Sequence, residues 1–225
     1  MRAAVIQFPG SNCDRDLVVA FQRAPDVRST VDLVWHKDSC LPPKLDVIGI
    51  PGGFSFGDHL RCGAIAAHSP IMKSVMEFAG KGGYIIGICN GFQVLTEAGL
   101  LPGTLMRNSG LRFLCKEVEL SVETTDSAFT CLLDRDENVR MPIAHHDGNY
   151  RTDRQTLNRL ADEDRIAFRY EKNPNGSQDS IAGVLSRNRR ILGIMPHPER
   201  CADPMTGGTG GSRLFEGLVS SLANG

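Results

Sequence analysis

The sequence predicts an α/β fold: an open, doubly wound, mostly parallel sheet with antiparallel additions. Two observations predict the parallel part. Short runs such as Ile85-Ile86-Gly87-Ile88 are apolar throughout, and they alternate with helix-like segments up to about residue 89. Strands without polar alternation suit a sheet that helices cover on both faces. The third observation predicts the additions, because "CKEVELSVET" (115–124) alternates apolar and polar residues like a strand with one wet face.

The elements follow from these patterns in chain order. In the first half the expected strands and helices are "AAVIQF" (3–8), the helix-like "CDRDLVVAFQRA" (13–24), "VDLVW" (31–35), "DVIGIP" (46–51), the helix-like segment 63–83, "YIIGIC" (84–89) and the helix-compatible "GFQVLTEAG". After 115–124 come the strand-like "NVRMPIAHH", "RIAFRYE", "SIAGVLS" and "RRILGIMP", and the helical "SRLFEGLVSSLANG" closes the chain. One mixed sheet explains these runs better than two domains.

Composition bounds the class of protein. The 225 residues, 41% of them hydrophobic, suit one domain over 1–225, and no linker or repeat interrupts them. The net charge of -1 gives no general attraction to nucleic acid or to a membrane. Seven scattered cysteines without a CxxC pair argue against a disulfide framework or zinc finger. No run resembles a signal peptide or a membrane span, so we expect a cytoplasmic protein.

Two local features have ordinary interpretations. The basic run "RNRR" (187–190) separates two strand-like runs, which favours a solvated hairpin turn over a nucleic-acid site. The adjacent His145 and His146 suggest a metal, but neighbouring strand residues point to opposite faces and do not readily share one ion. We therefore expect no metal site here.

Cys89 marks a break between a strand and a helix. Gly87-Ile88-Cys89-Asn90-Gly91 has the form G-x-C-x-G, the thiol counterpart of a nucleophile elbow, in which glycines relieve crowding on either side of the nucleophile. A helix beginning here would favour the thiolate and lower the pKa of Cys89. The elbow alone leaves an alternative open, since a lone cysteine is often a buried small hydrophobe.

Two further motifs supply partners for a nucleophile. His197 lies in Pro196-His197-Pro198-Glu199, and residues two apart in an extended segment point the same way. Cys89, His197 and Glu199 could thus form a triad. The loop "PGGFSFGD" (51–58) follows a strand, so the N–H groups of Gly53 and Asn90 could form an oxyanion hole. A phosphate cradle is the alternative, but the loop lacks both GxGxxG and a P-loop lysine.

At these residues the sequence resembles the triad class (class I) of glutamine amidotransferases, a family with a flavodoxin-like fold. It is similar in particular to the glutaminase subunits (subunit I) of phosphoribosylformylglycinamidine synthase, an enzyme of purine biosynthesis. The stretches that carry the resemblance are "FPGSNCDRD" (8–16), "PGGFSFGDHLRCGAIA" (51–66), "GICNGFQVLTEAGLLPG" (87–103), "RNSGLRFLCK" (107–116), "NPNGSQDSIAG" (173–183), "MPHPER" (195–200) and "GGTGGSRLF" (207–215).

The resemblance implies roles for the site residues. Cys89 would be the nucleophile that attacks L-glutamine, His197 the general base and acid, and Glu199 the residue that orients His197. Gly53 and Asn90 would hold the oxyanion, and Gln93 would bind the substrate. The resemblance gives no role to His145, His146 and Asp147, because relatives often have His-Gly-Glu-Gly there. No metal or cofactor is needed by this chain.

The resemblance also implies partners. Ammonia would pass to a separate large synthetase subunit, which uses ATP and magnesium, and a small third subunit would complete the complex. Met1 at the start and the closing helix suggest a free-standing subunit. We expect Arg107–Lys116 or Phe54–Arg61 to contact the synthetase. Three rival functions remain open at this point: a γ-glutamyl peptidase or hydrolase, a noncatalytic module of the same fold, and an amidotransferase of another pathway.

Overall fold

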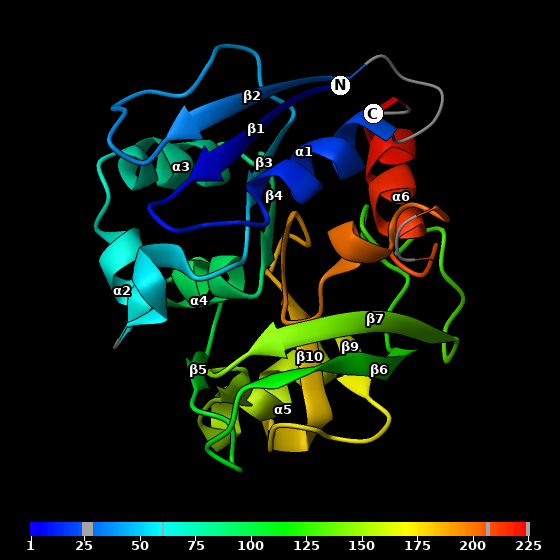
Figure 1. Ribbon diagram of the computed structural model, residues 1–225. Helices are drawn as coiled ribbons and strands as arrows, with labels where there is room; N and C mark the ends of the chain where they lie inside the picture. Colours follow the sequence, from blue (N-terminus) through cyan, green and yellow to red (C-terminus); the bar gives the residue numbers. More distant parts are fainter. Residues whose placement is uncertain (24–28, 60, 206–207, 224–225) are drawn as a thin grey trace.

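The computed structural model describes residues 1–23, 29–59, 61–205 and 208–223 (Figure 1). Four predicted features extend past these ranges. Ala24 ends the predicted first helix, Leu60 belongs to the predicted contact loop, Gly207 begins the last motif and residues 224–225 end the predicted final helix. These residues lie outside the described part of the chain.

A nine-stranded mixed sheet organises the described residues, in the order β2-β1-β3-β4-β11-β10-β9-β6-β7. The first five strands in this order are parallel, and each later strand runs antiparallel to its neighbour. The strands are β2 (Thr30–Trp35), β1 (Arg2–Gln7), β3 (Val47–Ile50), β4 (Tyr84–Ile88), β11 (Ile191–Ile194), β10 (Ile181–Leu185), β9 (Ile166–Tyr170), β6 (Leu114–Val122) and β7 (Asn138–His145). The predicted fold class is confirmed, and the order of the parallel strands is the flavodoxin-like one.

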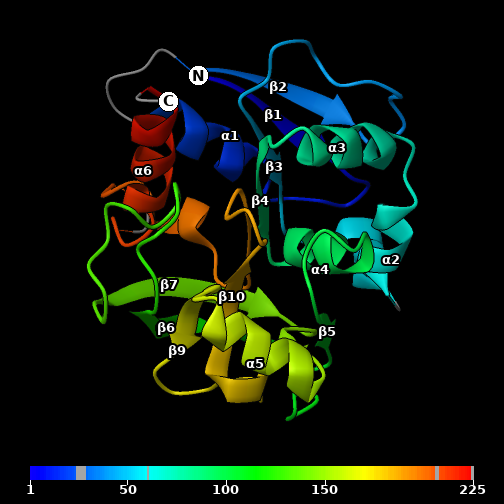
Figure 2. The same cartoon turned by 180° about the vertical axis from the view of Figure 1, so that it is seen from behind.

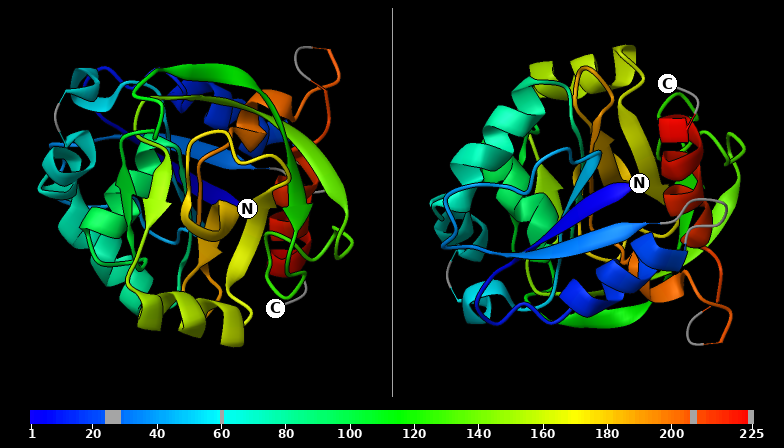
Figure 3. Two further views of the ribbon diagram at one scale, coloured as in Figure 1. Left: turned by 90° about the horizontal axis from the view of Figure 1, so that it is seen from below. Right: turned by 90° about the horizontal axis from the view of Figure 1, so that it is seen from above.

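Helices cover both faces of the parallel part (Figures 2 and 3). A Cβ on Gly49 of β3 would meet Leu17 and Phe21 of α1 (Asp14–Arg23), whereas a Cβ on Gly87 of β4 would meet Leu95 of α4 (Asn90–Glu97). Gly49 pairs with Ile86, so Gly87 points to the opposite face from Gly49. The α-helices are α1 (Asp14–Arg23), α2 (Cys62–Ala67), α3 (Ile71–Gly80), α4 (Asn90–Glu97), α5 (Arg154–Asp162) and α6 (Ser212–Ala223).

The core lies between these layers. β1, β3, β4 and β11 are almost wholly buried, which explains why their sequences show no polar alternation. The lower lobe in Figure 1 holds β6, β7, β9 and β10, where β6 and β7 alternate buried and more exposed residues as the sequence predicted.

Several predicted elements differ from the structure. The prediction of one continuous helix-like segment over 63–83 is wrong. α2 ends at Ala67 and α3 begins after Pro70, which has no N–H to continue a helix. α5 was missed, although Asp153 caps it by accepting a hydrogen bond from the Thr156 N–H at 2.8 Å. The small sheet of β5 (Thr104–Met106) and β8 (Asn149–Arg151) was also missed.

The structure confirms the turn at the basic run, and it gives the two histidines different surroundings. "RNRR" lies in the turn between the antiparallel β10 and β11, where Arg189 donates to the Glu163 and Asp164 carbonyls. His145 is buried and its Nδ1 is 3.1 Å from Asn108 Oδ1, whereas the ring of His146 packs on Phe113. The two histidines therefore have different partners. Among the described helices, none is both long and apolar enough to cross a membrane.

Candidate active site

The turn from β4 into α4 holds Cys89 in a strained conformation. Its φ of 52° and ψ of -107° are unusual for a residue with a side chain. A Cβ on Gly87 would lie 2.7 Å from the Gly91 carbonyl oxygen, and one on Gly91 would overlap the Ile50 carbonyl. The elbow thus requires both glycines. Gly87 is needed for the crowding against Gly91 that the sequence suggested, whereas Gly91 is needed because Ile50 of β3 lies close to it.

β11 brings His197 to the same place. It pairs in parallel with β4, and the Cys89 N–H donates to the Ile194 carbonyl at 2.8 Å. Three residues beyond Ile194, His197 leaves the sheet and enters a short 3₁₀ helix, η3 (Pro198–Cys201). Parallel strands end at one edge, so the pairing of β4 with β11 delivers both side chains to that edge.

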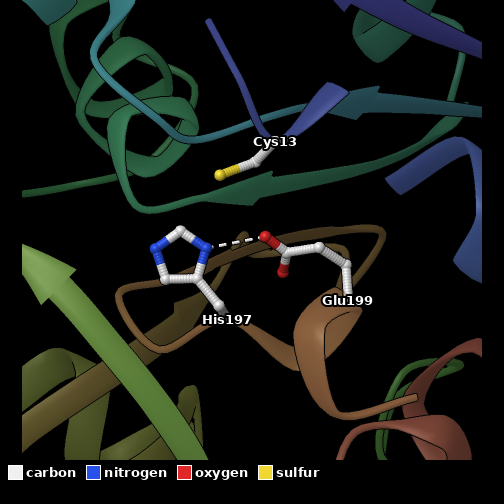
Figure 4. Close-up of side chains that lie close together, drawn as sticks. All are labelled: Cys13, His197 and Glu199. Carbon is white, nitrogen blue, oxygen red and sulfur yellow. Dashed lines mark hydrogen bonds and ion pairs between the residues drawn. The ribbon is translucent and has the colours of Figure 1, made fainter. Parts of the chain in front are cut away.

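His197 and Glu199 form a buried hydrogen-bonded pair (Figure 4). Their Nδ1 and Oε1 atoms are 2.6 Å apart, and both side chains are about 1% exposed. His197 Nε2 and Glu199 Oε2 are buried, and neither has a hydrogen-bond partner among the described residues. Nδ1–H therefore donates to the carboxylate, which leaves Nε2 available for a proton from a reacting group.

Cys89 and His197 meet across Gly52. A Cβ on Gly52 would lie 2.9 Å from both the Cys89 Cβ and the His197 Cε1. The Cys89 sulfur lies 3.7 Å from the Ala144 carbonyl of β7, and Cys89 is only 3% exposed. The three predicted triad residues are thus brought together at one buried point. Sequence reasoning missed Gly52, although the double glycine after β3 was the signal that could have found it.

The glycine loop lies between the elbow and the loop after β1. Gly53 has φ 87°, and its carbonyl accepts from the Asn12 N–H at 3.0 Å. The Gly52 carbonyl accepts from the Ser11 hydroxyl at 3.1 Å and from the Cys13 N–H at 3.4 Å. In a trans peptide N–H and C=O point in opposite directions, so the Gly53 N–H points away from the loop after β1.

The side chain of Asn90 ties this loop to the elbow. Its Oδ1 accepts from the Ser55 N–H at 3.2 Å, where η1 (Ser55–Asp58) begins. Its Nδ2 donates to Asp58 Oδ1 at 3.1 Å and to Gln93 Oε1 at 3.0 Å, and it lies 3.2 Å from the Cys62 sulfur. A buried network therefore holds the predicted oxyanion loop against α4. Sequence reasoning missed Asp58 and Cys62.

Gln93 is buried and points into the same network. Its Nε2 donates to the Asp147 carbonyl at 2.8 Å, and the Cys62 thiol donates to its Oε1 at 3.0 Å. Arg107 Nε donates to the Asp147 carboxylate at 2.9 Å. Gln93 thus connects Asn90 to the exposed Arg107, and its amide must exchange partners to bind a substrate.

The electrostatics of Cys89 differ from the expectation. Burial raises the pKa of the Cys89 thiol well above its ordinary value, and the charges of Cys13, Asp58 and Glu199 raise this pKa further. The Asn90 N–H at the start of α4 lowers the pKa, but by less. The predicted lowering of the pKa is therefore wrong for this closed site, because loss of hydration outweighs the helix start.

Comparison with known proteins agrees with this geometry. Residues 1–208 match the model of a family described as "CobB/CobQ-like glutamine amidotransferase domain". The glutaminase domain of Trypanosoma brucei CTPS with bound acivicin superposes with a TM-score of 0.65 at 16% identity, over 100% of this chain and 94% of that one, which shows the shared fold. The chain belongs to the CobB/CobQ-like glutamine amidotransferase family.

Proteins with higher sequence identity define a narrower group within this family. Two "Phosphoribosylformylglycinamidine synthase subunit PurQ" proteins, from Cereibacter sphaeroides and Roseobacter denitrificans, are 60% and 62% identical, each over 99% of both chains. A chain in "Structure of PurLQS from Thermotoga maritima" is 40% identical, with a TM-score of 0.89 over 98% of both chains. These findings confirm the predicted resemblance to the glutaminase subunits of phosphoribosylformylglycinamidine synthase, and with it an enzyme of purine biosynthesis.

Proposed function

We propose that Cys89, His197 and Glu199 hydrolyse glutamine through a covalent thioester. The observation that carries this proposal is the meeting of the Cys89 elbow and the buried His197–Glu199 pair across Gly52. His197 takes the thiol proton as the sulfur attacks the side-chain amide carbon of glutamine. Since burial disfavours a free thiolate, this proton transfer generates the nucleophile as attack begins.

The remaining steps use the same groups. The N–H groups of Gly53 and Asn90 stabilise the oxyanion, and a donor of this kind contributes about 10²–10³ in rate. His197 returns the proton to the leaving nitrogen, so that ammonia departs and the glutamyl thioester remains. Water then gives a proton to His197 and attacks the thioester. Glutamate leaves, and the proton returns to the Cys89 sulfur. Gln93 would hold the substrate amide after releasing the Asp147 carbonyl.

We also propose the partners. Ammonia passes to a large synthetase subunit that uses ATP and Mg²⁺ to convert formylglycinamide ribonucleotide to its amidine, with a small third subunit in a cytoplasmic complex. The similarity to a chain in "Structure of PurLQS" supports an assembly. The burial of Cys89 supports a dependence on partner subunits, because the residues that cover Cys89 must move before glutamine can reach its sulfur.

One exposed apolar surface suits the synthetase. Phe54 and Phe113 stack with ring centroids 6.0 Å apart, so the two segments proposed from the sequence meet in space. Leu111 is 74% exposed and Met106 is 52% exposed on the same stretch of chain as Phe113. Arg107 in this stretch connects to Gln93 through Asp147. Contact at this surface would therefore reach the glutamine site directly.

The test compares two nitrogen sources in the reconstituted complex. Cys89→Ala should abolish glutamine-dependent amidine formation and leave ammonia-dependent formation unchanged, because only the first reaction uses the thioester. Cys40→Ala, which alters an exposed thiol outside the proposed contact segments, is the matched control and should leave both rates unchanged. Equal use of glutamine by Cys89→Ala and the unaltered protein would contradict the proposal.

A further inference from the structure

A third side chain lies beside the His197–Glu199 pair. The thiol of Cys13, in the loop that leads into α1, points toward the hydrogen-bonded imidazole and carboxylate (Figure 4). The sulfur, a ring nitrogen of His197 and a carboxylate oxygen of Glu199 all lie within 4.8 Å of one another. All three residues are buried, and the proposed mechanism uses only two of them.

These three groups are a chemically suitable set of zinc ligands. Thiolate, imidazole and carboxylate bind Zn²⁺ at about 2.0–2.3 Å, so tetrahedral geometry separates ligand atoms by about 3–4 Å. The observed separations allow this geometry after small side-chain movements, with the 2.6 Å His197–Glu199 contact opening. Glu199 Oε2 is buried and has no hydrogen-bond partner among the described residues, which indicates unused capacity for a ligand.

Charge and access also favour a cation. A thiolate and a carboxylate together balance the two charges of Zn²⁺, which lowers the cost of burying each charge. Glu199 also lines a cavity of about 540 Å³, bounded by Asp16 and Ala20 of α1 and by Arg200. The cavity reaches Glu199, whose side chain is 1% exposed, so it offers an entry path once the side chains over the cluster move.

We propose that Cys13, His197 and Glu199 form an inhibitory site for Zn²⁺. Binding releases the Cys13 thiol proton to solvent, moves the Nδ1 proton of His197 to its Nε2 atom, and puts the metal on Nδ1 in place of the hydrogen bond to Glu199. His197 is then a metal ligand and cannot relay protons for Cys89. The binding of metal stands on the cluster alone, whereas the inhibition rests on the catalytic roles proposed above.

Binding is tested without activity. Co²⁺ is the probe, because a thiolate ligand gives it a near-ultraviolet charge-transfer band and tetrahedral geometry gives intense visible bands. The protein is Cys89→Ala, which removes the nucleophile as a ligand. One Co²⁺ per chain should give both sets of bands. Adding Cys13→Ser, or Cys13→Ala as a second variant, should abolish the charge-transfer band, provided that circular dichroism shows a folded protein.

Cys201→Ser is the matched control. Cys201 is also buried and its sulfur lies 3.6 Å from the His197 carbonyl, but it is not in the ligand cluster. The Cys89→Ala/Cys201→Ser protein should keep the full Co²⁺ spectrum. An unchanged spectrum without Cys13, or an equal loss without Cys201, would overturn the proposed site.

Inhibition is tested in the reconstituted complex, with Cys89 retained. Zn²⁺ should lower the glutamine-dependent rate relative to the ammonia-dependent rate, and EDTA should restore it. Each variant is compared with its own zinc-free rate. Cys13→Ser should raise the inhibitory Zn²⁺ concentration by about tenfold or more, and Cys201→Ser should not change it. An unchanged inhibitory concentration in Cys13→Ser would overturn the inhibitory role. If Co²⁺ binds through Cys13 but Cys89→Ala still uses glutamine, the proposed function fails and the metal site stands.

Discussion

Gly87 of β4 lies directly opposite Gly193 of β11 in the register of the parallel sheet. A Cβ on Gly193 would overlap the ring of Phe92, and one on Gly87 would meet Leu95, so α4 packs closely on this pair of glycines. The same register sets Cys89 beside the end of β11 and therefore near His197. Close packing of α4 and formation of the active site thus depend on one strand pairing.

The glycine at the start of α4 should not tolerate a side chain. In Gly91→Ala the new Cβ would overlap the Ile50 carbonyl, which belongs to the rigid sheet. We expect a loss of about 1–3 kcal/mol in the free energy of unfolding, measured by denaturant titration, and loss of glutaminase activity. Gly80→Ala is the control, because a Cβ there meets no described atom within 4 Å; a gain of about 0.5–1 kcal/mol is expected. Equal stability of Gly91→Ala and the unaltered protein would contradict the packing argument.

Replacing Glu199 by glutamine should slow catalysis, because this change removes the charge of the side chain and keeps its shape. Glu199→Gln loses the carboxylate that accepts the Nδ1–H bond of His197, so the imidazolium formed during attack is not stabilised. The glutamine-dependent kcat should fall by about 10²–10⁴, while the ammonia-dependent rate of the complex stays constant. Asp16→Asn, which breaks an exposed ion pair with Arg200, should leave both rates unchanged. A Glu199→Gln enzyme with full glutamine activity would exclude the triad.

The Asn90 side chain should matter for stability as well as for rate. Asn90→Ala leaves the Ser55 N–H and the Gln93 Oε1 atom without that partner in a buried network. We expect a loss of about 1–3 kcal/mol in the free energy of unfolding, together with a lower glutamine-dependent kcat. Asn158→Ala, at an exposed position of α5, is the control and should change the free energy of unfolding by about 0.5 kcal/mol or less. Comparable losses in the two variants would argue against the network.

His145 should make stability depend on pH. Burial, followed by the charges of His197 and His146, lowers the pKa of His145 from 6.5 to about 3. Between these values the unfolded chain binds a proton that the folded chain does not. This group's stability contribution is therefore complete above about pH 6.5 and is lost toward pH 3, by up to about 1.4 kcal/mol per pH unit.

The pH dependence of the free energy of unfolding distinguishes the titration of His145 from the loss of its packing contacts. Denaturant titrations from pH 7 to pH 4 should show a smaller pH dependence for His145→Gln than for the unaltered protein, whatever its absolute stability. His68→Gln changes an exposed histidine and should keep the original slope. Parallel curves for His145→Gln and the unaltered protein would rule out His145 as the titrating group.

A charge on the apolar surface should weaken assembly. Leu111→Asp puts a carboxylate on a side chain that is 74% exposed and that the proposed contact would bury. We expect at least a tenfold larger Kd for the synthetase, about 1.4 kcal/mol, by sedimentation or calorimetry. Met76→Asp on α3 is the control, because Met76 is 46% exposed on the other lobe in Figure 1. Equal Kd values for Leu111→Asp and the unaltered protein would show that the synthetase binds at another surface.

The sequence alone determined the features that depend on nearby residues. An apolar run predicts a buried strand, glycines two residues either side of Cys89 permit the elbow, and two prolines hold His197 and Glu199 in one short segment. These signals are local because backbone sterics and side-chain periodicity act over a few residues. The roles of Cys89, His197, Glu199, Gly53, Asn90 and Gln93, and a single domain over 1–225, stay predictions.

Only the tertiary structure decided which distant segments meet. It set β11 beside β4, brought Gly52 between Cys89 and His197, and placed Cys13 against the triad. It also reversed the expected pKa of Cys89, since the start of α4 is visible in the sequence but complete burial is not. The physical reason is common to these cases: strand pairing and desolvation are sums over residues far apart in the chain, and no short motif contains them.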